Sequence, residues 1–265
     1  NKMEIRKNKQ WLWALPVSLA ALVTTGCQER AVPKSEQTTT TQQQEKSESI
    51  ALIQAKVVPV KLTKPEACDA NGCMQYDIQS VKTNLKWIDD YFIDRIKKTD
   101  PIAFSTAPNQ KINTAEGADP NLSQSSTYVR FIAQQYDQAT FAIQTYTYSS
   151  GAAHGMHHQE FVNFDLKNKK RLALQDILVK GTEQQVLNAL YDSNSIWLDQ
   201  HTIERSQLKL SDNFYYGANG IVFVYPLYEL ASYAEGMSEL TLPYVVLSKL
   251  VKAEYLPSLP HYPTP

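Results

Sequence analysis

The chain has 265 residues, of which 26 are lysine or arginine and 27 are aspartate or glutamate. The first 27 residues hold four of the basic and one of the acidic residues, so the remainder carries 22 basic against 26 acidic side chains, a net charge of −4. Nucleic-acid binding needs a basic surface that neutralises a series of phosphates, so this composition argues against a nucleic-acid partner.

The first 27 residues have the layout of an export signal. Four basic residues precede the apolar stretch Trp11–Val23, which is shorter than the about 20 residues of a membrane span. Small residues then lead to Cys27, as in bacterial lipoprotein signals, where this cysteine becomes the acylated first residue. With Gln28 next, we expect a lipid anchor in the outer membrane, facing the periplasm of a Gram-negative bacterium. The alternative is ordinary cleavage that leaves Cys27 as a thiol.

Residues 28–49 have almost no apolar side chains and include a run of threonine and glutamine. Such a segment buries too little surface to offset its ordering entropy, so we expect a disordered tether. The remaining length suffices for a large globular unit. We predict an α+β fold of antiparallel sheets and packed helices in two intimately associated lobes, residues 50–126 and 127–256, followed by a proline-rich tail, residues 257–265.

Two further cysteines, Cys68 and Cys73, flank an Asn-Gly turn. An exported chain with its two remaining cysteines five positions apart favours a disulfide across a hairpin loop. A zinc site is the rival interpretation, but two thiolates without a nearby histidine are too few ligands.

The first lobe is predicted to contain strands at residues 55–64 and 74–79, and then an amphipathic helix. The helix is indicated by apolar residues that recur at spacings of three and four: Val81, Leu85, Ile88, Phe92 and Ile96. The same stretch carries three carboxylates: Asp89, Asp90 and Asp94. Paired carboxylates can act as acid and base, but the basic residues beside them favour a solvated charged face.

The second lobe is predicted to open with a hairpin, residues 127–136 and 140–149, that is rich in aromatic residues. Alternation along a strand sends about half of these rings to each face of the sheet. We identify Tyr128, Tyr146 and Tyr148 as candidate ligand-binding residues, because exposed tyrosines contribute large contact area at low entropic cost. The alternative is that they only stabilise the sheet as cross-strand pairs.

The sequence then presents three histidines, His154, His157 and His158. Imidazoles are common zinc and copper ligands, but no cysteine or carboxylate at a characteristic spacing completes a site here. We therefore expect no metal and no cofactor. We interpret His154 as a loop residue and include it among the candidate ligand-binding residues.

Further elements follow to the end of the chain. A strand at residues 160–166, a basic turn and a short strand lead to a helix entry at Asp176. A helix is predicted from Thr182 to Arg205, with Thr182 as N-cap, Gln185 completing a capping box, and a break near Asn194. Residues 214–216 and 221–225 indicate a hairpin, and residues 245–256 a closing helix.

Two stretches carry a family resemblance. The first is a tyrosine-rich strand, Gly-x-x-His-Gly at residues 151–155, and FVNFDLKNKKRLALQDIL at residues 161–178; the second is PLYELASYAEG at residues 226–236. Together they resemble the RsiV-like extracytoplasmic domain family, DUF3298, with a DUF4163-like N-terminal part. The family includes the lysozyme-binding part of the anti-sigma factor RsiV and a domain that accompanies the catalytic domain of PdaC-type peptidoglycan deacetylases.

The functional expectation follows from this resemblance and from the motifs. The sequence has no Gly-x-Ser-x-Gly elbow, phosphate-binding loop, His-Glu-x-x-His or dinucleotide fingerprint, so we assign no catalytic residue. The resemblance implies a binding module for a cell-envelope ligand, either a lysozyme-like protein or a peptidoglycan fragment. The alternatives are an envelope assembly lipoprotein and a hydrolase or amidase built around His154. The sequence does not indicate an oligomeric state.

Overall fold

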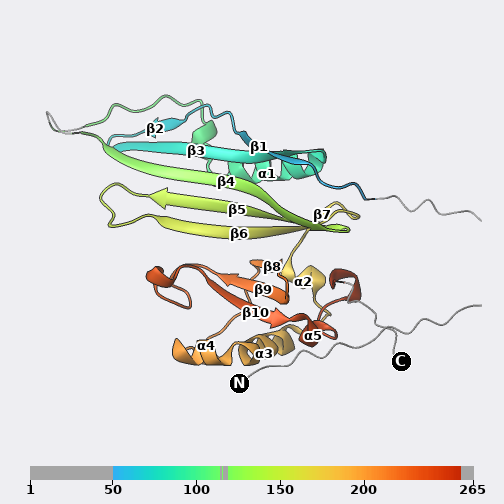
Figure 1. Cartoon of the computed structure of the whole chain (residues 1–265). Helices are drawn as coiled ribbons and strands as arrows, with labels where there is room; N and C mark the ends of the chain where they lie inside the picture. Colours follow the sequence, from blue (N-terminus) through green and yellow to red (C-terminus); the bar gives the residue numbers. More distant parts are fainter. Residues whose placement is uncertain (1–49, 114, 116–118, 258–265) are drawn as a thin grey trace, which may run out of the picture. The chain divides into compact units, whose positions relative to one another are not determined.

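The computed structural model describes residues 50–113, 115 and 119–257 (Figure 1). The predicted signal segment, the lipidation site Cys27, the tether and nearly all of the tail lie outside the described residues. No helix in the described part of the chain is both long enough and apolar enough to cross a membrane.

The first sheet has seven strands, in the order β1-β3-β4-β5-β6-β7, with β2 paired to β3 (Figure 1). The strands are β1 (Ala55–Pro59), β2 (Glu66–Cys68), β3 (Gly72–Thr83), β4 (Asn121–Gln135), β5 (Gln138–Tyr148), β6 (Met156–Asp165) and β7 (Lys170–Leu172). The pairs are antiparallel except β3 with β4, which run parallel. The sheet is therefore mixed, while the predicted α+β class is confirmed.

A parallel pair needs a crossover connection, and here it contains α1 (Lys86–Thr99) and η1 (Pro101–Phe104). The helix packs on one sheet face, where its buried residues meet buried residues of β4, β5 and β6. The helix members of this core are Ile88, Phe92 and Ile96, and the strand members include Val129, Phe141, Val162 and Phe164. This core fixes α1 against the middle of the sheet.

The prediction that the helix already includes Val81 is wrong, because β3 continues to Thr83. The carboxylate of Asp89 accepts hydrogen bonds from the Thr83 amide, at 2.8 Å, and from its hydroxyl, at 2.7 Å. These bonds fix the turn between strand and helix. The prediction of a solvated charged face is therefore wrong for Asp89, which is buried. It is confirmed for Asp90, which pairs with Lys86 at 2.6 Å on the exposed side.

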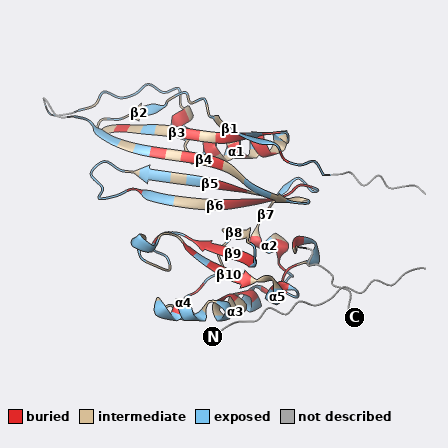
Figure 2. Cartoon of the chain, in the orientation of Figure 1, coloured by how far each residue is buried: buried red, intermediate tan, exposed pale blue. Residues whose placement is uncertain are grey.

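The second sheet has the order β10-β9-β8 and consists of β8 (Phe214–Tyr216), β9 (Gly220–Tyr225) and β10 (Ser238–Pro243). The helical segments around it are α2 (Leu174–Ile177), α3 (Glu183–Ser193), α4 (Ser195–Gln200), η2 (Tyr233–Glu235), α5 (Tyr244–Leu247) and η3 (Ala253–Tyr255). In Figure 2 β9 is wholly buried, whereas β10 is buried at alternate residues and α4 is largely exposed.

Several predicted helix boundaries in this part are wrong. The predicted break near Asn194 is confirmed, and the Asn194 side-chain amide donates there to the carbonyls of Leu190 and Thr241, but α4 ends at Gln200 and not at Arg205. Thr182 precedes the helix, but its hydroxyl donates to the Val179 carbonyl, so the predicted capping box does not form. The closing helix is only four residues long.

The segment after α5 leaves the helical path because its backbone pairs with the end of α2. The Val179 amide donates to the Leu250 carbonyl, and the Lys252 amide donates to the Ile177 carbonyl, both at 2.9 Å. These bonds require an extended bridge rather than a continuous helix. Leu247, Leu250, Val251 and Tyr255 of this segment are buried in the core, whereas Val245 and Val246 are exposed.

The two sheets contact each other through β6 and β8. Apolar packing joins Ala142 and Phe161 of the first sheet to Val222 and Val224 of the second. Beside it, the Asn163 amide donates to the Phe214 carbonyl at 2.8 Å. The predicted lobe boundary, between residues 126 and 127, lies inside β4, so strands of the first sheet come from both predicted lobes.

One ion pair connects the end of α4 to η2. The imidazole of His201 stacks on Trp197 with ring centroids 3.8 Å apart, and its Nε2 lies 2.7 Å from Oε1 of Glu235. The hydrogen bond to this carboxylate is the main reason that the pKa of His201 is raised, and the same bond lowers the pKa of Glu235.

Candidate functional site

The sheet face opposite α1 carries mostly polar side chains. Cross-strand partners point to the same face, and the register aligns Gln79, Tyr128, Gln144 and Gln159 in one row and Asp77, Ser126, Tyr146 and His157 in the next. A third row contains Gln75, Gln124 and Tyr148. We call these eleven residues the polar sheet face.

The second sheet covers only one end of this face. Ala142 and Phe161 lie two residues along from Gln144 and Gln159, and they are buried against the second sheet. The end of β5 and the start of β6 remain largely exposed (Figure 2). The polar sheet face is therefore the uncovered continuation of a packed surface.

Two hollows lie on the polar sheet face. One, of about 370 Å³, is lined by Ser126, Tyr128, Gln144, Thr145, Tyr146, His157, His158, Gln159 and Met237. The other, of about 450 Å³, is lined by Pro65, Glu66, Gln75, Tyr76, Asp77, Gln124 and Ser126. Because Ser126 lines both, we describe them together as the cross-strand groove.

Tyr128 is held in position at the centre of the groove. Its hydroxyl donates to the carboxylate of Asp77, and this bond is the main cause that raises the pKa of Tyr128. The guanidinium of Arg130 lies 5.1 Å from the Tyr128 ring centroid, and Arg130 also donates to Gln79 at 2.6 Å. The hydroxyl is thus held by a carboxylate, and the ring lies against a guanidinium.

Tyr146 packs over the glycine that follows His154. A Cβ atom added at Gly155 would overlap the Tyr146 ring, so only glycine permits this approach. The Tyr146 residue nevertheless remains 39% exposed. The last glycine of the Gly-x-x-His-Gly motif therefore has a defined packing role.

His154 lies beside the groove but does not line it. Its ring stacks on Tyr233 with centroids 4.0 Å apart, and its Nδ1 lies 3.0 Å from the Gly155 carbonyl oxygen. Its Nε2 is 3.3 Å from the Tyr228 hydroxyl, and Tyr233 donates to the Gly155 carbonyl at 2.9 Å. This cluster joins the β5–β6 loop to the segment before β10.

The four candidate ligand-binding residues therefore occupy different positions. Tyr128 and Tyr146 line the cross-strand groove, Tyr148 lies on the same face one row away, and His154 belongs to the neighbouring cluster. His157 lines the groove as well, although the sequence analysis considered it only as a metal ligand.

Sequence reasoning missed the glutamines of the groove. They occur at the same alternate positions as the tyrosines: Gln144 with Tyr146 in β5, and Gln159 with His157 in β6. Every second residue of a strand points to the same face, so the alternation along each strand was a signal that would have found them. No local signal pointed to Met237, which reaches the groove from the segment before β10.

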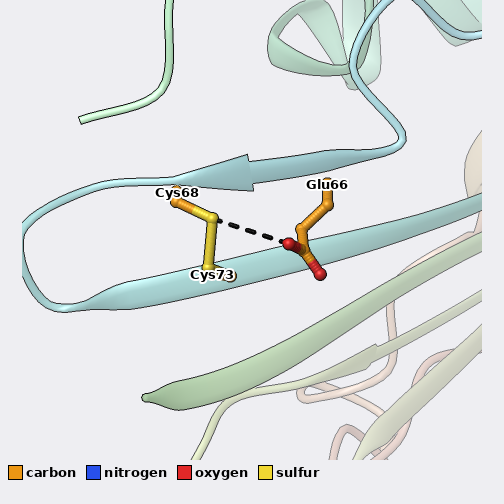
Figure 3. Close-up of side chains that lie close together, drawn as sticks. All are labelled: Glu66, Cys68 and Cys73. Atoms are coloured by element: carbon orange, nitrogen blue, oxygen red, sulfur yellow. Dashed lines mark hydrogen bonds between the residues drawn. A yellow bond between two sulfur atoms is a disulfide. The ribbon is translucent and has the colours of Figure 1, made fainter. Parts of the chain in front are cut away.

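The predicted disulfide between Cys68 and Cys73 is confirmed. The two residues face each other across β2 and β3 with Cα atoms 4.0 Å apart. Figure 3 shows the disulfide beside Glu66, whose Oε1 lies 3.8 Å from the Cys68 sulfur. Among the described residues, these three form the one group of metal-ligand types close enough to share an ion, but bonded sulfurs are not thiolate ligands.

Comparison with known proteins supports the family resemblance. Residues 164–245 match the family described as "Protein of unknown function (DUF3298)". A search of curated proteins found no match. The match begins within β6 and extends through the second sheet. The finer resemblance to RsiV and PdaC-type proteins, and the DUF4163-like part, stay predictions.

Two crystal structures share the fold. A DUF3298 family protein from Pseudomonas aeruginosa PAO1 aligns with a TM-score of 0.59 and 19% identity over 79% of this chain and 99% of its own. A DUF3298 family member from Bacteroides fragilis NCTC 9343 aligns with a TM-score of 0.54 and 16% identity, over 77% and 96% of the respective chains. Residues 164–245 are therefore a DUF3298 domain, within a chain that has the fold of solved DUF3298 family proteins.

Proposed function

We propose that the chain is a non-enzymatic binding module of the cell envelope, anchored by lipid on Cys27, and that its ligand docks on the polar sheet face. The observation that carries the proposal is the cross-strand groove, in which Tyr128 and Tyr146 lie among hydrogen-bonding side chains on four adjacent strands.

The arrangement has the properties of a preorganised binding surface. Its side chains project from paired strands, which hold them more precisely than loops do. Tyrosines contribute large contact area with few rotatable bonds, and the fixed ring of Tyr128 has little side-chain entropy left to lose on binding. A ligand would therefore meet anchors that are already in place.

The ligand classes are those that the family resemblance implies, a lysozyme-like protein or a peptidoglycan fragment. The net charge of −4 after residue 27 favours the approach of a basic protein such as a lysozyme. A groove of amide and tyrosine side chains suits a glycan. The two classes differ in their salt dependence, since association driven by charge weakens as ionic strength increases.

The hydrolase alternative finds no support in the surroundings of His154. A general base is normally oriented by a carboxylate or a similar acceptor. In the described part of the chain, His154 contacts a backbone carbonyl and two tyrosines, and none of its hydrogen-bond partners is a carboxylate.

The test is binding of residues 50–265 to purified sacculi and to a c-type lysozyme across a salt series. We expect saturable binding to at least one of them, weakened about tenfold or more by Tyr146→Ala or Tyr128→Ala. Tyr136→Ala is the matched control, because Tyr136 is 84% exposed in the turn at the other end of β4 and β5.

Binding that weakens with salt would identify a protein ligand, and salt-independent binding to sacculi would identify a glycan. No binding to either, or equal loss in the Tyr136→Ala control, would contradict the proposal. Crosslinking to a stable envelope protein in the absence of any binding would favour the assembly alternative.

A further inference from the structure

The half of the cross-strand groove that lies over β4, β5 and β6 is lined by neutral and imidazole side chains, and the two charged groups that contact Tyr128 from outside this lining, Asp77 and Arg130, are of opposite sign. Among the described residues that line this hollow, none is aspartate, glutamate, lysine or arginine. Charge complementarity therefore favours an uncharged ligand here. A basic protein would find its carboxylates in the other half, at Glu66 and Asp77.

The neutral half is equipped for hydrogen bonding. Gln144 and Gln159 are direct cross-strand partners, so their carboxamides lie side by side on the polar sheet face. The hydrogen bonds of Gln159 to Met237 and Asn213 use its backbone groups, so its carboxamide has no hydrogen-bond partner among the described residues and is left for a ligand. Each carboxamide offers two N–H donors and one carbonyl acceptor.

Apolar surface lies beside these carboxamides. The ring of Tyr128 is in the same row as Gln144 and Gln159, and the ring of Tyr146 is in the next row. Met237 adds an apolar wall at the β6 side, where its sulfur accepts the Gln159 amide at 3.2 Å. A ligand here needs apolar faces and amide or hydroxyl groups at short intervals.

The size and shape of the site narrow the ligand class. The hollow of about 370 Å³ is concave and falls in the range of small-ligand sites, about 300–1,000 Å³. The neutral half crosses β4, β5 and β6, and two spacings of about 4.8 Å between strands give a length of about 10 Å. This length accommodates a short linear oligomer lying across the strands.

We propose that the neutral half of the groove is a saccharide subsite for an uncharged, N-acetylated oligosaccharide. The apolar faces of the sugar rings pack on Tyr128 and Tyr146. The acetamido groups pair with the carboxamides of Gln144 and Gln159, with their methyl groups toward Met237. The inference rests on the proposed function and names the ligand class of the same surface.

The test is calorimetric titration of the full chain with N-acetylglucosamine tetramer, with cellotetraose as the probe that lacks acetamido groups. We expect saturable binding of the acetylated tetramer and at least tenfold weaker binding of cellotetraose. Gln144→Leu and Gln159→Leu should each weaken binding by about five- to tenfold, since each removes hydrogen bonds to the ligand. Gln135→Leu, on an exposed glutamine at the end of β4, should leave binding unchanged.

Three results would overturn the inference, provided that all variants retain the unfolding midpoint of the unmodified chain. The first is no saturable binding of the acetylated tetramer up to about 10 mM. The second is equal binding of cellotetraose, and the third is unchanged affinity in both glutamine variants. If sacculi or lysozyme still bind in a Tyr146-dependent manner, only the subsite fails and the proposed function stands.

Discussion

Asn213 completes the outer edge of β6, and its removal should destabilise the contact between the two sheets. On this edge β7 pairs only with residues 163–165, so the preceding backbone groups of β6 lack a strand partner. The side chain of Asn213 replaces one: its amide donates to the Gln159 carbonyl, and its carbonyl oxygen accepts the Phe161 amide, both at 2.8 Å.

The cost of Asn213→Ala follows from the two backbone groups left without a partner. A buried group that loses its hydrogen bond costs about 1–3 kcal/mol. Asn213 and Gln159 are only partly buried, so water restores part of the loss. We therefore expect the free energy of unfolding to fall by about 2–3 kcal/mol, near the lower end of the sum for two groups.

Urea denaturation of residues 50–265 measures this effect. With a slope of about 2 kcal/mol/M, the midpoint should fall by about 1–1.5 M. Asn188→Ala is the matched control, because the Asn188 side chain lies on α3 and accepts only one exposed hydrogen bond, from Gln184 at 3.2 Å. Its midpoint should change by less than about 0.3 M.

A shift in the Asn213→Ala variant no larger than in the control would refute the reasoning. It would mean that the backbone groups at the edge of β6 do not need the Asn213 side chain as a hydrogen-bond partner. The slope of the free energy of unfolding against urea concentration identifies a different outcome, in which the two sheets unfold separately. In that case the slope would fall or two transitions would appear.

Three more predictions concern other contacts. The double change Cys68→Ser and Cys73→Ser should lower the free energy of unfolding by about 2 kcal/mol in urea, because the reduced hairpin gains chain entropy when unfolded; an unchanged midpoint would contradict this. Gly155→Ala should displace the Tyr146 ring that packs on this glycine. It should weaken binding to sacculi or lysozyme at least as much as Tyr146→Ala does, and full affinity would show that the β5–β6 loop adapts to the added methyl group. Because the pKa of His201 is raised in the folded protein, His201 stabilises the fold below pH 6.5, and this contribution is lost as pH rises through the folded pKa. Because the pKa of Glu235 is lowered, Glu235 stabilises the fold above pH 4.5, and this contribution is lost as pH falls through the folded pKa. Thermal melting should therefore show the largest deficit of Glu235→Gln between pH 4.5 and 6.5, and a constant deficit up to pH 8 would exclude the ion pair as its cause.

Local patterns predicted most strands and overextended the helices. The β4–β5 and β8–β9 hairpins lie close to their predicted positions, because alternation and turn residues act over short distances. Val81 fits a helical period but lies in β3, and the predicted closing helix ends at Leu247, after which Val251 bridges to Leu178. The regular spacing of apolar residues indicates which residues are buried. The segment that packs against them decides whether their backbone is helical or extended.

The sequence by itself determined the α+β class and the Cys68–Cys73 disulfide, since alternation and cysteine spacing are local properties. The register between paired strands placed Tyr128, Tyr146 and the groove glutamines on one face. Only the tertiary structure decided that these residues line a groove. The parallel pairing of β3 with β4 brings Asp77 against Tyr128, and the second sheet covers one end of the face and contributes Met237. Both depend on contacts between residues far apart in the chain, which no local period encodes.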